Sequence, residues 1–92
     1  MNQLRFREPI DRAVFSRAEQ DLVPQMSAID GFRGFYAVQT SETDVTLVIL
    51  GDDAEVLDRV ATEVGSPWMR ANIVPLLAQL PDRLVGAVVA SA

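Results

Sequence analysis

The stretch FRGFYAVQTSETDVTLVIL, residues 32–50, decides the fold of this chain. It contains two runs rich in aromatic and β-branched residues, 32–40 and 44–50, which meet at the short polar segment SETD. Such runs are typical of β-strands, and a polar connection of this length is typical of a β-hairpin. Gly34 inside the first run predicts a bulge or a close backbone approach. We therefore expect two antiparallel strands at the centre of the chain.

The segments on both sides of this hairpin have helical periodicity. Before it, apolar residues recur every three or four positions: Phe15, Ala18, Leu22, Met26 and Ile29. After it, the same spacing joins Leu57, Val60, Ala61 and Val64. This spacing places each set on one face of a helix. We expect Asp11 to cap the first helix and Gly31 to close it, and we expect the same of Asp52 and Gly65 for the second helix.

A third helix is predicted to follow directly, with Ser66 as its N-cap and Pro67 in its first turn. Its apolar stripe is formed by Met69, Ile73, Leu76 and Leu80. Proline residues at positions 24 and 75 are expected to kink the first and the third helix.

Two outer strands complete the predicted order. Residues 4–7 alternate apolar with charged side chains, and the run LVGAVVA at residues 84–90 is apolar throughout. The resulting order is β-α-β-β-α-α-β over residues 1–92, which we take as a single domain. Two β-α-β halves around a hairpin predict an α+β, ferredoxin-like fold, with a four-stranded antiparallel sheet and the helices on one face.

The predicted sheet has two apolar faces, but the helices can cover only one of them. In the third strand, Val45, Leu47 and Ile49 point to one face, and Val48 and Leu50 point to the other. In the second strand, Phe32, Tyr36 and Val38 are expected to face the helices. A sheet with one wet face alternates apolar with polar residues, and these strands do not. We therefore expect a homodimer through the sheet face; the alternative is a monomer with an apolar surface.

The composition excludes several classes of function. The net charge is −5 and all eight basic residues are arginine, so we expect no nucleic-acid partner, because an acidic chain repels phosphate backbones. The chain has no cysteine and no histidine. It therefore lacks the usual ligands of zinc, iron–sulfur clusters and haem, and also the Ser-His-Asp and Cys-His catalytic arrangements. We expect no metal and no cofactor, and we interpret Asp52, Asp53 and Glu55 as a charged first helical turn.

The two ends of the chain indicate a cytoplasmic protein. The first residues, MNQLRFREP, carry charges where a signal peptide needs an apolar core. The apolar run at residues 84–90 is much shorter than the roughly 20 residues that a membrane helix requires. We therefore expect no membrane partner.

The segment GSPWMRANIVP, residues 65–75, supplies most of the candidate site residues. It holds the only tryptophan, Trp68, and Asn72 lies one helical turn later on the same side. Tyr36 is expected to look toward Trp68 across the gap between helix and sheet, and Asn72 is a candidate partner for its hydroxyl. The alternative is that Trp68 is a core side chain and Asn72 lies at the edge of the stripe.

Arg5 and Arg7 alternate with apolar residues and are predicted to face the sheet–sheet side. Two interpretations are open. The arginines either pair with carboxylates, as charged groups in such places usually do, or they form an anion site at the dimer interface.

Taken in order, the segments LVPQM, DGFRGFYAV, SPWMRANIVPLL and RLVGAVV resemble the dimeric α/β-barrel superfamily. Within it, the chain is most similar to the antibiotic biosynthesis monooxygenase-like domains, and the resemblance covers nearly the whole chain. It implies a homodimer whose two sheets pack face to face. It also implies a small pocket between each sheet and its own helices.

Members of that family differ in activity. Some oxidise aromatic polyketides without a cofactor, some degrade haem with a proximal histidine that this chain lacks, and many have no known activity. The resemblance thus implies a cofactor-independent oxygenase acting on a small aromatic compound. The cofactor-free oxygenases of the family resemble this chain in having Trp, Tyr, Asn and Arg near the pocket, and Trp68, Tyr36, Asn72 and Arg70 are the residues here that could take such parts. Our candidate catalytic residues are Tyr36, Asn72 and Arg70, and our candidate substrate-binding residues are Trp68 and Phe32. The alternative is a non-catalytic ligand-binding or protein-interaction module whose pocket is filled by side chains.

Overall fold

The computed structural model describes residues 1–91. Its four-stranded sheet has the order β2-β3-β1-β4, and every pairing is antiparallel. The strands are β1 (Asn2–Arg5), β2 (Phe32–Gln39), β3 (Asp44–Gly51) and β4 (Asp82–Arg83). The helical segments are α1 (Arg12–Ser27), α2 (Ala54–Val60), the π-helical turn η1 (Ala61–Gly65), α3 (Ser66–Asn72) and the 3-10 turn η2 (Val74–Leu76).

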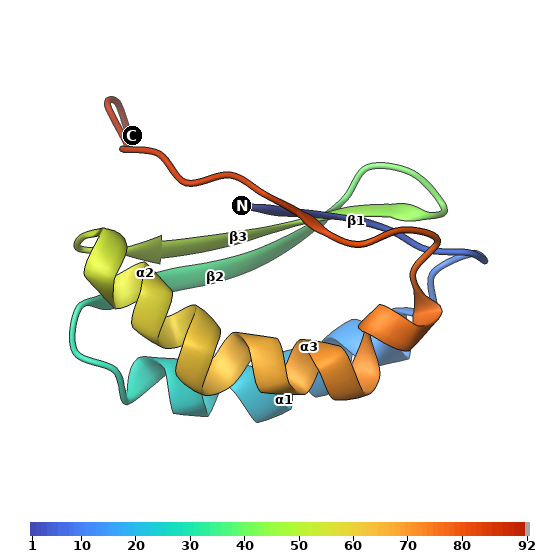
Figure 1. Cartoon of the computed structure of the whole chain (residues 1–92), viewed down its shortest axis with the longest axis horizontal. Coiled ribbons are helices and arrows are strands. Elements are labelled where there is room, and N and C mark those ends of the chain that lie inside the picture. Colours follow the sequence, from blue (N-terminus) through green and yellow to red (C-terminus); the bar gives the residue numbers. More distant parts are fainter. Residues whose placement is uncertain (92) are drawn as a thin grey trace.

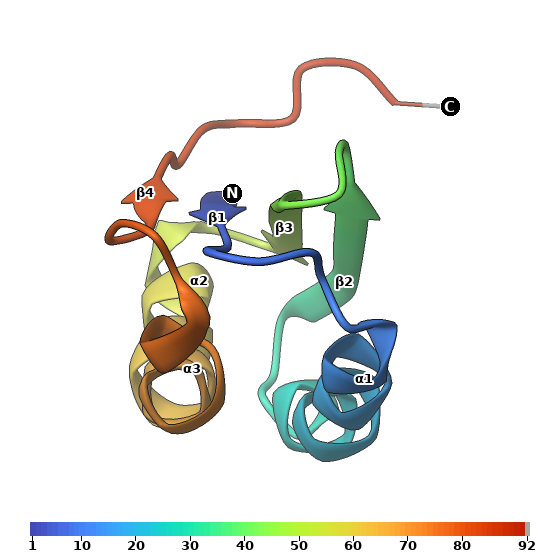
Figure 2. The same cartoon turned by 90° about the vertical axis from the view of Figure 1, so that its right-hand side faces the viewer.

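Within residues 1–91, the helices all lie against one face of the sheet and none covers the other face (Figure 1, Figure 2). We call the uncovered side the open face. The predicted four-stranded antiparallel sheet with helices on one face is confirmed, and the strand order is compatible with a ferredoxin-like fold. No helix within residues 1–91 has the length and apolar character needed to cross a membrane.

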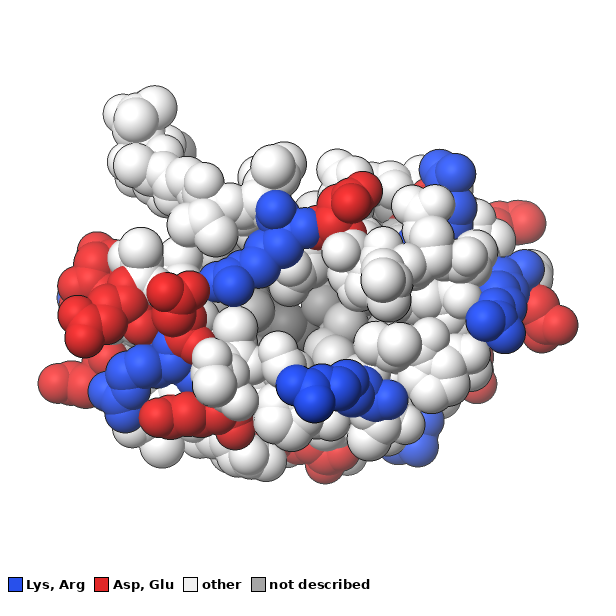
Figure 3. Space-filling model, in the orientation of Figure 1, with Lys and Arg blue, Asp and Glu red and all other residues white. Residues whose placement is uncertain are grey.

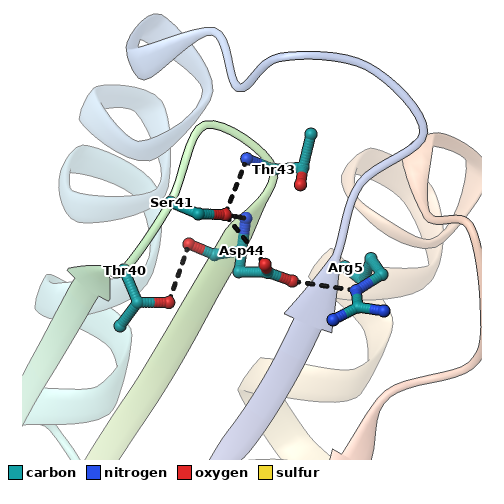
Figure 4. A network of polar contacts seen from close by, with 5 residues as sticks. All are labelled: Arg5, Thr40, Ser41, Thr43 and Asp44. Carbon is teal, nitrogen blue, oxygen red and sulfur yellow. Dashed lines mark hydrogen bonds and ion pairs between the residues drawn. The ribbon is translucent and has the colours of Figure 1, made fainter.

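The loop between β2 and β3 is held by the side chain of Ser41 (Figure 4). Its hydroxyl oxygen accepts hydrogen bonds from the backbone amides of Thr43, at 3.2 Å, and Asp44, at 3.0 Å, and it donates to Asp44 Oδ2 at 2.8 Å. Arg5 donates from Nε to Asp44 Oδ1 at 3.0 Å. The Ser41 and Arg5 hydrogen bonds hold the pKa of the Asp44 carboxyl below its usual range. Of the two interpretations of Arg5, the structure shows the pairing with a carboxylate.

The bulge predicted at Gly34 is confirmed. The register of β2 against β3 shifts between Phe32 and Gly34. A bulge adds one residue to a strand, and so it reverses the alternation of the residues that follow. As a consequence Phe32 and Phe35 both pack on the helical side, whereas Tyr36 lies on the open face.

Helix α1 begins as predicted but ends earlier. The Asp11 side chain caps it by accepting a hydrogen bond from a first-turn amide at 3.0 Å. The helix ends at Ser27 with Ala28 as its C-cap, so the predicted closing by Gly31 is wrong. Ile29, two residues beyond the helix, is buried in the core. Gly31, with a φ of 92°, provides the left-handed turn that leads into β2.

Helix α2 is capped one residue later than predicted. Asp53 Oδ1 accepts a hydrogen bond from the amide of Val56 at 2.9 Å. Asp52 instead accepts from Arg33 Nε at 2.6 Å, and this contact joins the start of β2 to the turn after β3. Among the residues that the structure describes, no cluster of carboxylates is placed to hold a metal ion.

The predicted break between the second and third helices is wrong. Gly65 and Ser66 both have helical backbone angles, so α2, η1 and α3 form one continuous helical segment. In a regular α-helix, a proline ring collides with the carbonyl four residues earlier. The wider turn η1 lies just before Pro67, and the Ser66 amide bonds to the carbonyl of Ala61, five residues back. The widened turn lets the chain pass Pro67 without ending the helix.

The helical segment stops at Asn72, before the end of the predicted stripe. Pro75 lies in the 3-10 turn η2, so the predicted kinked helix is absent here. Leu76 and Leu80, expected to be buried, have exposed fractions of 44% and 79%. Because Pro75 has no amide hydrogen and disfavours helical angles in the residue before it, the chain turns away from the helix axis.

The predicted last strand, residues 84–90, is also wrong. β4 comprises only Asp82 and Arg83, and residues 84–91 have no regular secondary structure. The backbone of Leu84 still bonds to that of Met1, and after Leu84 the apolar run leaves the sheet.

Two clusters of buried apolar side chains form the core between sheet and helices. One consists of Leu4, Phe6, Val14, Val45, Leu47, Ile73 and Leu77. The other consists of Ala18, Leu22, Met26, Ile29, Val60 and Val64. Phe35 and Trp68 pack against both clusters and so join them into one layer.

Candidate functional site

A pocket of about 220 Å³ opens between the helices and the sheet, on the side that carries β4. Figure 3, in the orientation of Figure 1, shows a hollow near the middle of this face, with arginine side chains above and below it. The lining residues come from all four strands and from the helical segments on both sides of the core. We call this hollow the sheet–helix pocket.

Apolar side chains form the inner wall of the sheet–helix pocket. They are Leu22 and Met26 of α1, Phe35 of β2, Leu47 and Ile49 of β3, and Met69 of α3. Each of them belongs to one of the two core clusters or packs against it. Since the core holds these side chains in place, the wall is formed before any ligand arrives, as is usual for small-molecule sites.

Small residues of the π-helical turn provide the space. Ala61, Gly65 and Ser66 line the pocket at the junction of η1 and α3. A Cβ atom added at Gly65 would have its nearest neighbour, the carbonyl oxygen of Val60, at 3.6 Å. The missing side chain at position 65 therefore leaves open room, and a larger residue there would extend into the pocket. Turns of this wide type are often found at functional sites.

Two arginine side chains place positive charge at the opening of the pocket. Arg70 stands on α3 and Arg83 on β4. Arg83 Nη2 lies 3.1 Å from Asp58 Oδ1, and both side chains of this pair are widely open to solvent. Within the described part of the chain, Arg70 has no ion-pair partner. No acidic residue lines the pocket itself, and since Asp58 already pairs with Arg83, Arg70 is the cation that is available to an anionic group.

The lining residues limit what the pocket can do chemically. Its charged groups are the two guanidinium groups, which donate hydrogen bonds and have no acceptor atom. The other polar side chains are those of Asn2 and Ser66. The pocket can bind and orient a small molecule, but its own lining offers no acid–base group near neutral pH.

Of the five candidate site residues, Tyr36, Asn72, Arg70, Trp68 and Phe32, only Arg70 lines this pocket. Trp68 turns toward α1, where its indole Nε1 donates to Asp21 Oδ2 at 3.2 Å. Asn72 donates from Nδ2 to the backbone carbonyl of Trp68 at 3.0 Å, within its own helical segment. These contacts agree with the alternative interpretation, in which Trp68 belongs to the core and Asn72 lies at its edge.

The expectation that Tyr36 faces the helices is wrong. It pairs with Val48 on the open face and is 59% exposed. Its ring lies over Gly34, with Cε2 at 3.4 Å from the position that a Cβ atom would occupy there. The bulge accounts for the error, because it reverses the alternation that placed Tyr36 with Phe32. Phe32 itself packs under the sheet against the second core cluster.

A second, wider groove of about 900 Å³ runs along the opposite edge of the sheet, between β2 and α1. Its apolar lining includes Phe15 and Val23 of α1 and Phe32 of β2. The strand residues 36–39 that border it are exposed. We call it the edge groove. It encloses a small molecule less well than the sheet–helix pocket does, so it is not our candidate site.

The walls of the sheet–helix pocket do not follow from the sequence patterns. The helical periodicity places Leu22 and Met26 in the core, and no sequence pattern marks Arg83 as a site residue. One signal was present: Ala61 and Gly65 are small residues four positions apart, on one face of a predicted helix. Two small residues facing an apolar strand indicate either close packing or room for a ligand.

Comparison of the chain with known protein families, with curated proteins and with solved structures finds no match.

Proposed function

We propose that this protein is a homodimeric binding domain that holds a small apolar or aromatic molecule in the sheet–helix pocket. The main support for this proposal is the pocket itself, which has a volume of about 220 Å³ and apolar walls. An engineered apolar cavity of about 150 Å³ is large enough to bind benzene. Pockets for drug-sized ligands measure about 300–1,000 Å³. A molecule with a single ring is therefore the size class that fits.

The charge at the mouth narrows the class of ligand further. Arg70 and Arg83 would bind a carboxylate or another anionic group, because guanidinium forms paired, charge-assisted hydrogen bonds with such groups. Asp58 competes for Arg83, but from an exposed position where ion pairs contribute little. The favoured ligand has a small apolar body and one anionic end.

A cofactor-independent oxygenase acting on a small aromatic compound is the catalytic form of this proposal. It rests on the resemblance to antibiotic biosynthesis monooxygenase-like domains. Proton transfer in such a reaction calls for a general base within hydrogen-bond reach of the substrate. Tyr36 lies across the sheet from the pocket, Asn72 is bonded to its own helix, and the Arg70 guanidinium has no acceptor atom. The lining therefore favours binding over catalysis, and a non-catalytic module is the stronger form of the two.

The open face supports the homodimer. Tyr36 and Val38 have exposed fractions of 59% and 50%, and the neighbouring Val48 and Leu50 are only partly covered. The strand register places Tyr36 beside Val48, so the four side chains form one apolar patch. Exposed apolar patches on small domains mark interaction sites. A second copy that presents the same patch would cover both, as in a symmetric dimer whose sheets pack face to face.

The purified protein is expected to bind single-ring molecules, for which toluene and benzoate serve as probes. A ligand that binds only the folded state adds about 2.7 kcal/mol to the free energy of unfolding at one hundred times its Kd. Both probes should therefore raise the melting temperature in calorimetry. Benzoate should bind more tightly, because its carboxylate meets Arg70 and Arg83.

Two variants control this experiment. Gly65→Leu fills the pocket at a position with helical angles, so it should fold and show no shift with either probe. Arg70→Gln should weaken benzoate binding by about tenfold or more and leave toluene binding unchanged. If neither probe shifts the wild type at saturating concentration, or if Gly65→Leu responds like the wild type, the pocket proposal is refuted.

A further inference from the structure

Gly65 lies inside a continuous helical segment, where glycine is an unfavourable residue. Its backbone angles, φ −66° and ψ −54°, are those of an ordinary right-handed helix, which a residue with a side chain adopts without strain. Glycine loses more conformational entropy on folding than alanine does, and alanine is the most favourable residue in a helix interior. The backbone therefore gives no reason for a glycine at this position.

Close packing gives no reason either. A Cβ atom added at Gly51 would lie 3.0 Å from Val56 Cγ1, and one added at Gly31 would lie 2.8 Å from Val56 Cγ2, so both of these glycines allow a close contact. Gly65 is more deeply buried than either of them. Among the described residues outside its own helical turn, only the carbonyl oxygen of Val60 lies within 4 Å of its Cβ position, at 3.6 Å. A buried position that faces open space borders a cavity.

The open space at Gly65 belongs to the sheet–helix pocket. Ala61 and Met69, before and after Gly65 in the helical segment, line the same pocket. Arg70 follows Gly65 by five residues, which is about 7.5 Å along the axis of a helix. A ligand whose anionic group binds Arg70 at the opening would therefore extend its apolar end toward Gly65.

The pocket has more room than an unsubstituted ring needs. A cavity of about 150 Å³ is sufficient for benzene, and the sheet–helix pocket measures about 220 Å³. A methyl group at position 65 would stabilise the helix and would occupy part of this extra room. The glycine thus lowers the stability of the helix and leaves space in the pocket, as residues at functional sites often do.

We infer that Gly65 sets the size limit of the ligand, and that the ligand is a single-ring carboxylate with a short apolar substituent on the far side of the ring. The carboxylate binds Arg70, and the substituent lies against Gly65. This inference rests on the proposed binding function and deepens it, because it names the residue that selects among ligands of one chemical class.

Gly65→Ala is expected to change the order of affinities for benzoate, 4-methylbenzoate and 4-ethylbenzoate, measured by titration calorimetry with the full chain. One methylene group in an apolar pocket changes affinity by about 10–200-fold. The variant should therefore lose about tenfold or more in affinity for 4-ethylbenzoate relative to benzoate. Without ligand, its melting temperature should rise by about 2–8 °C, because alanine favours the helix.

Two variants separate pocket size from helix stability. Ala61→Gly removes a methyl group from the same wall, so it should lower the melting temperature and increase the preference for 4-ethylbenzoate. Thr62 is exposed and lies outside the pocket lining. Thr62→Ala should therefore raise the melting temperature and leave the order of affinities unchanged.

The outcomes distinguish this inference from the proposed function. If the benzoates bind the wild type and Gly65→Ala keeps the wild-type order of affinities, Gly65 does not select the ligand. The inference also fails if Gly65→Ala melts below the wild type, since the fold itself would then require the glycine, or if Ala61→Gly leaves the preference unchanged. In all these cases the binding function stands. If none of the three benzoates binds the wild type, the binding function itself is refuted.

Discussion

Replacing Ile73 by alanine is expected to lower the free energy of unfolding by about 2–5 kcal/mol. Ile73 is 0% exposed and lies at the end of α3, in the cluster that contains Leu4 and Phe6 of the first strand region. Its amide donates to the carbonyl of Met69 at 2.8 Å, which fixes the backbone at this point. The cavity left by the lost atoms would therefore collapse only partly. Urea unfolding at one fixed protein concentration measures the change.

Leu80→Ala is the matched control for this prediction. Leu80 belongs to the same apolar stripe in the sequence, but in the structure it is exposed. Its truncation should change the free energy of unfolding by no more than about 0.5 kcal/mol. Equal losses for Ile73→Ala and Leu80→Ala would mean that the helix continues as the stripe predicts, and the described end of α3 would be refuted.

The elements that the sequence predicts well are those with local signals. The hairpin follows from two strand-like runs around a polar loop, and Ser41 shows how that loop closes on itself. The start of α1 follows from Asp11, whose side chain satisfies an amide of the first turn. Such signals need no knowledge of the rest of the fold, which is why they can be found without it.

Two kinds of prediction fail. One depends on the alternation of side chains along a strand, and the other depends on whether packing outweighs local helix preferences. The bulge at Gly34 could be predicted, but its effect on alternation moved Tyr36 to the other face. The break at Gly65 was inferred from glycine and proline preferences. Packing of the apolar face outweighs those preferences, and a single wide turn accommodates Pro67. The sheet–helix pocket depends on the bulge, which turns Phe35 toward the helices, and on the continuous helical segment, which includes Gly65, because both residues line it. Its position therefore does not follow from the sequence alone.

The run at residues 84–90 shows a third kind of limit. Its composition is that of a strand, but a strand needs the backbone groups of a neighbouring strand as hydrogen-bond partners. The described chain pairs only Asp82 and Arg83 with β1 and adds the backbone hydrogen bonds between Leu84 and Met1. Composition indicates which segments can pair, and only the arrangement of the chains decides where they do.

Val48→Asp is expected to dissociate the proposed homodimer. Val48 lies on β3 in the apolar patch of the open face, directly opposite Tyr36. An unpaired carboxylate buried between two apolar sheets costs several kcal/mol, so the dissociation constant should rise by about a hundredfold or more. In the separated chains the same carboxylate faces water, and the variant should stay folded by circular dichroism. Light scattering after size exclusion at low micromolar concentration should change from twice the chain mass of 10.1 kDa to that mass itself.

Two further variants separate charge from shape in this experiment. Val48→Thr keeps the branched side chain without a charge and should remain dimeric. Leu80→Asp places the same charge on an exposed apolar residue outside the sheet and should also remain dimeric. A wild-type chain that elutes as a monomer would refute the homodimer, because an apolar patch of this kind would then be stable in water. A dimeric Val48→Asp variant would instead refute the open face as the interface, since two such carboxylates cannot be buried together without a partner.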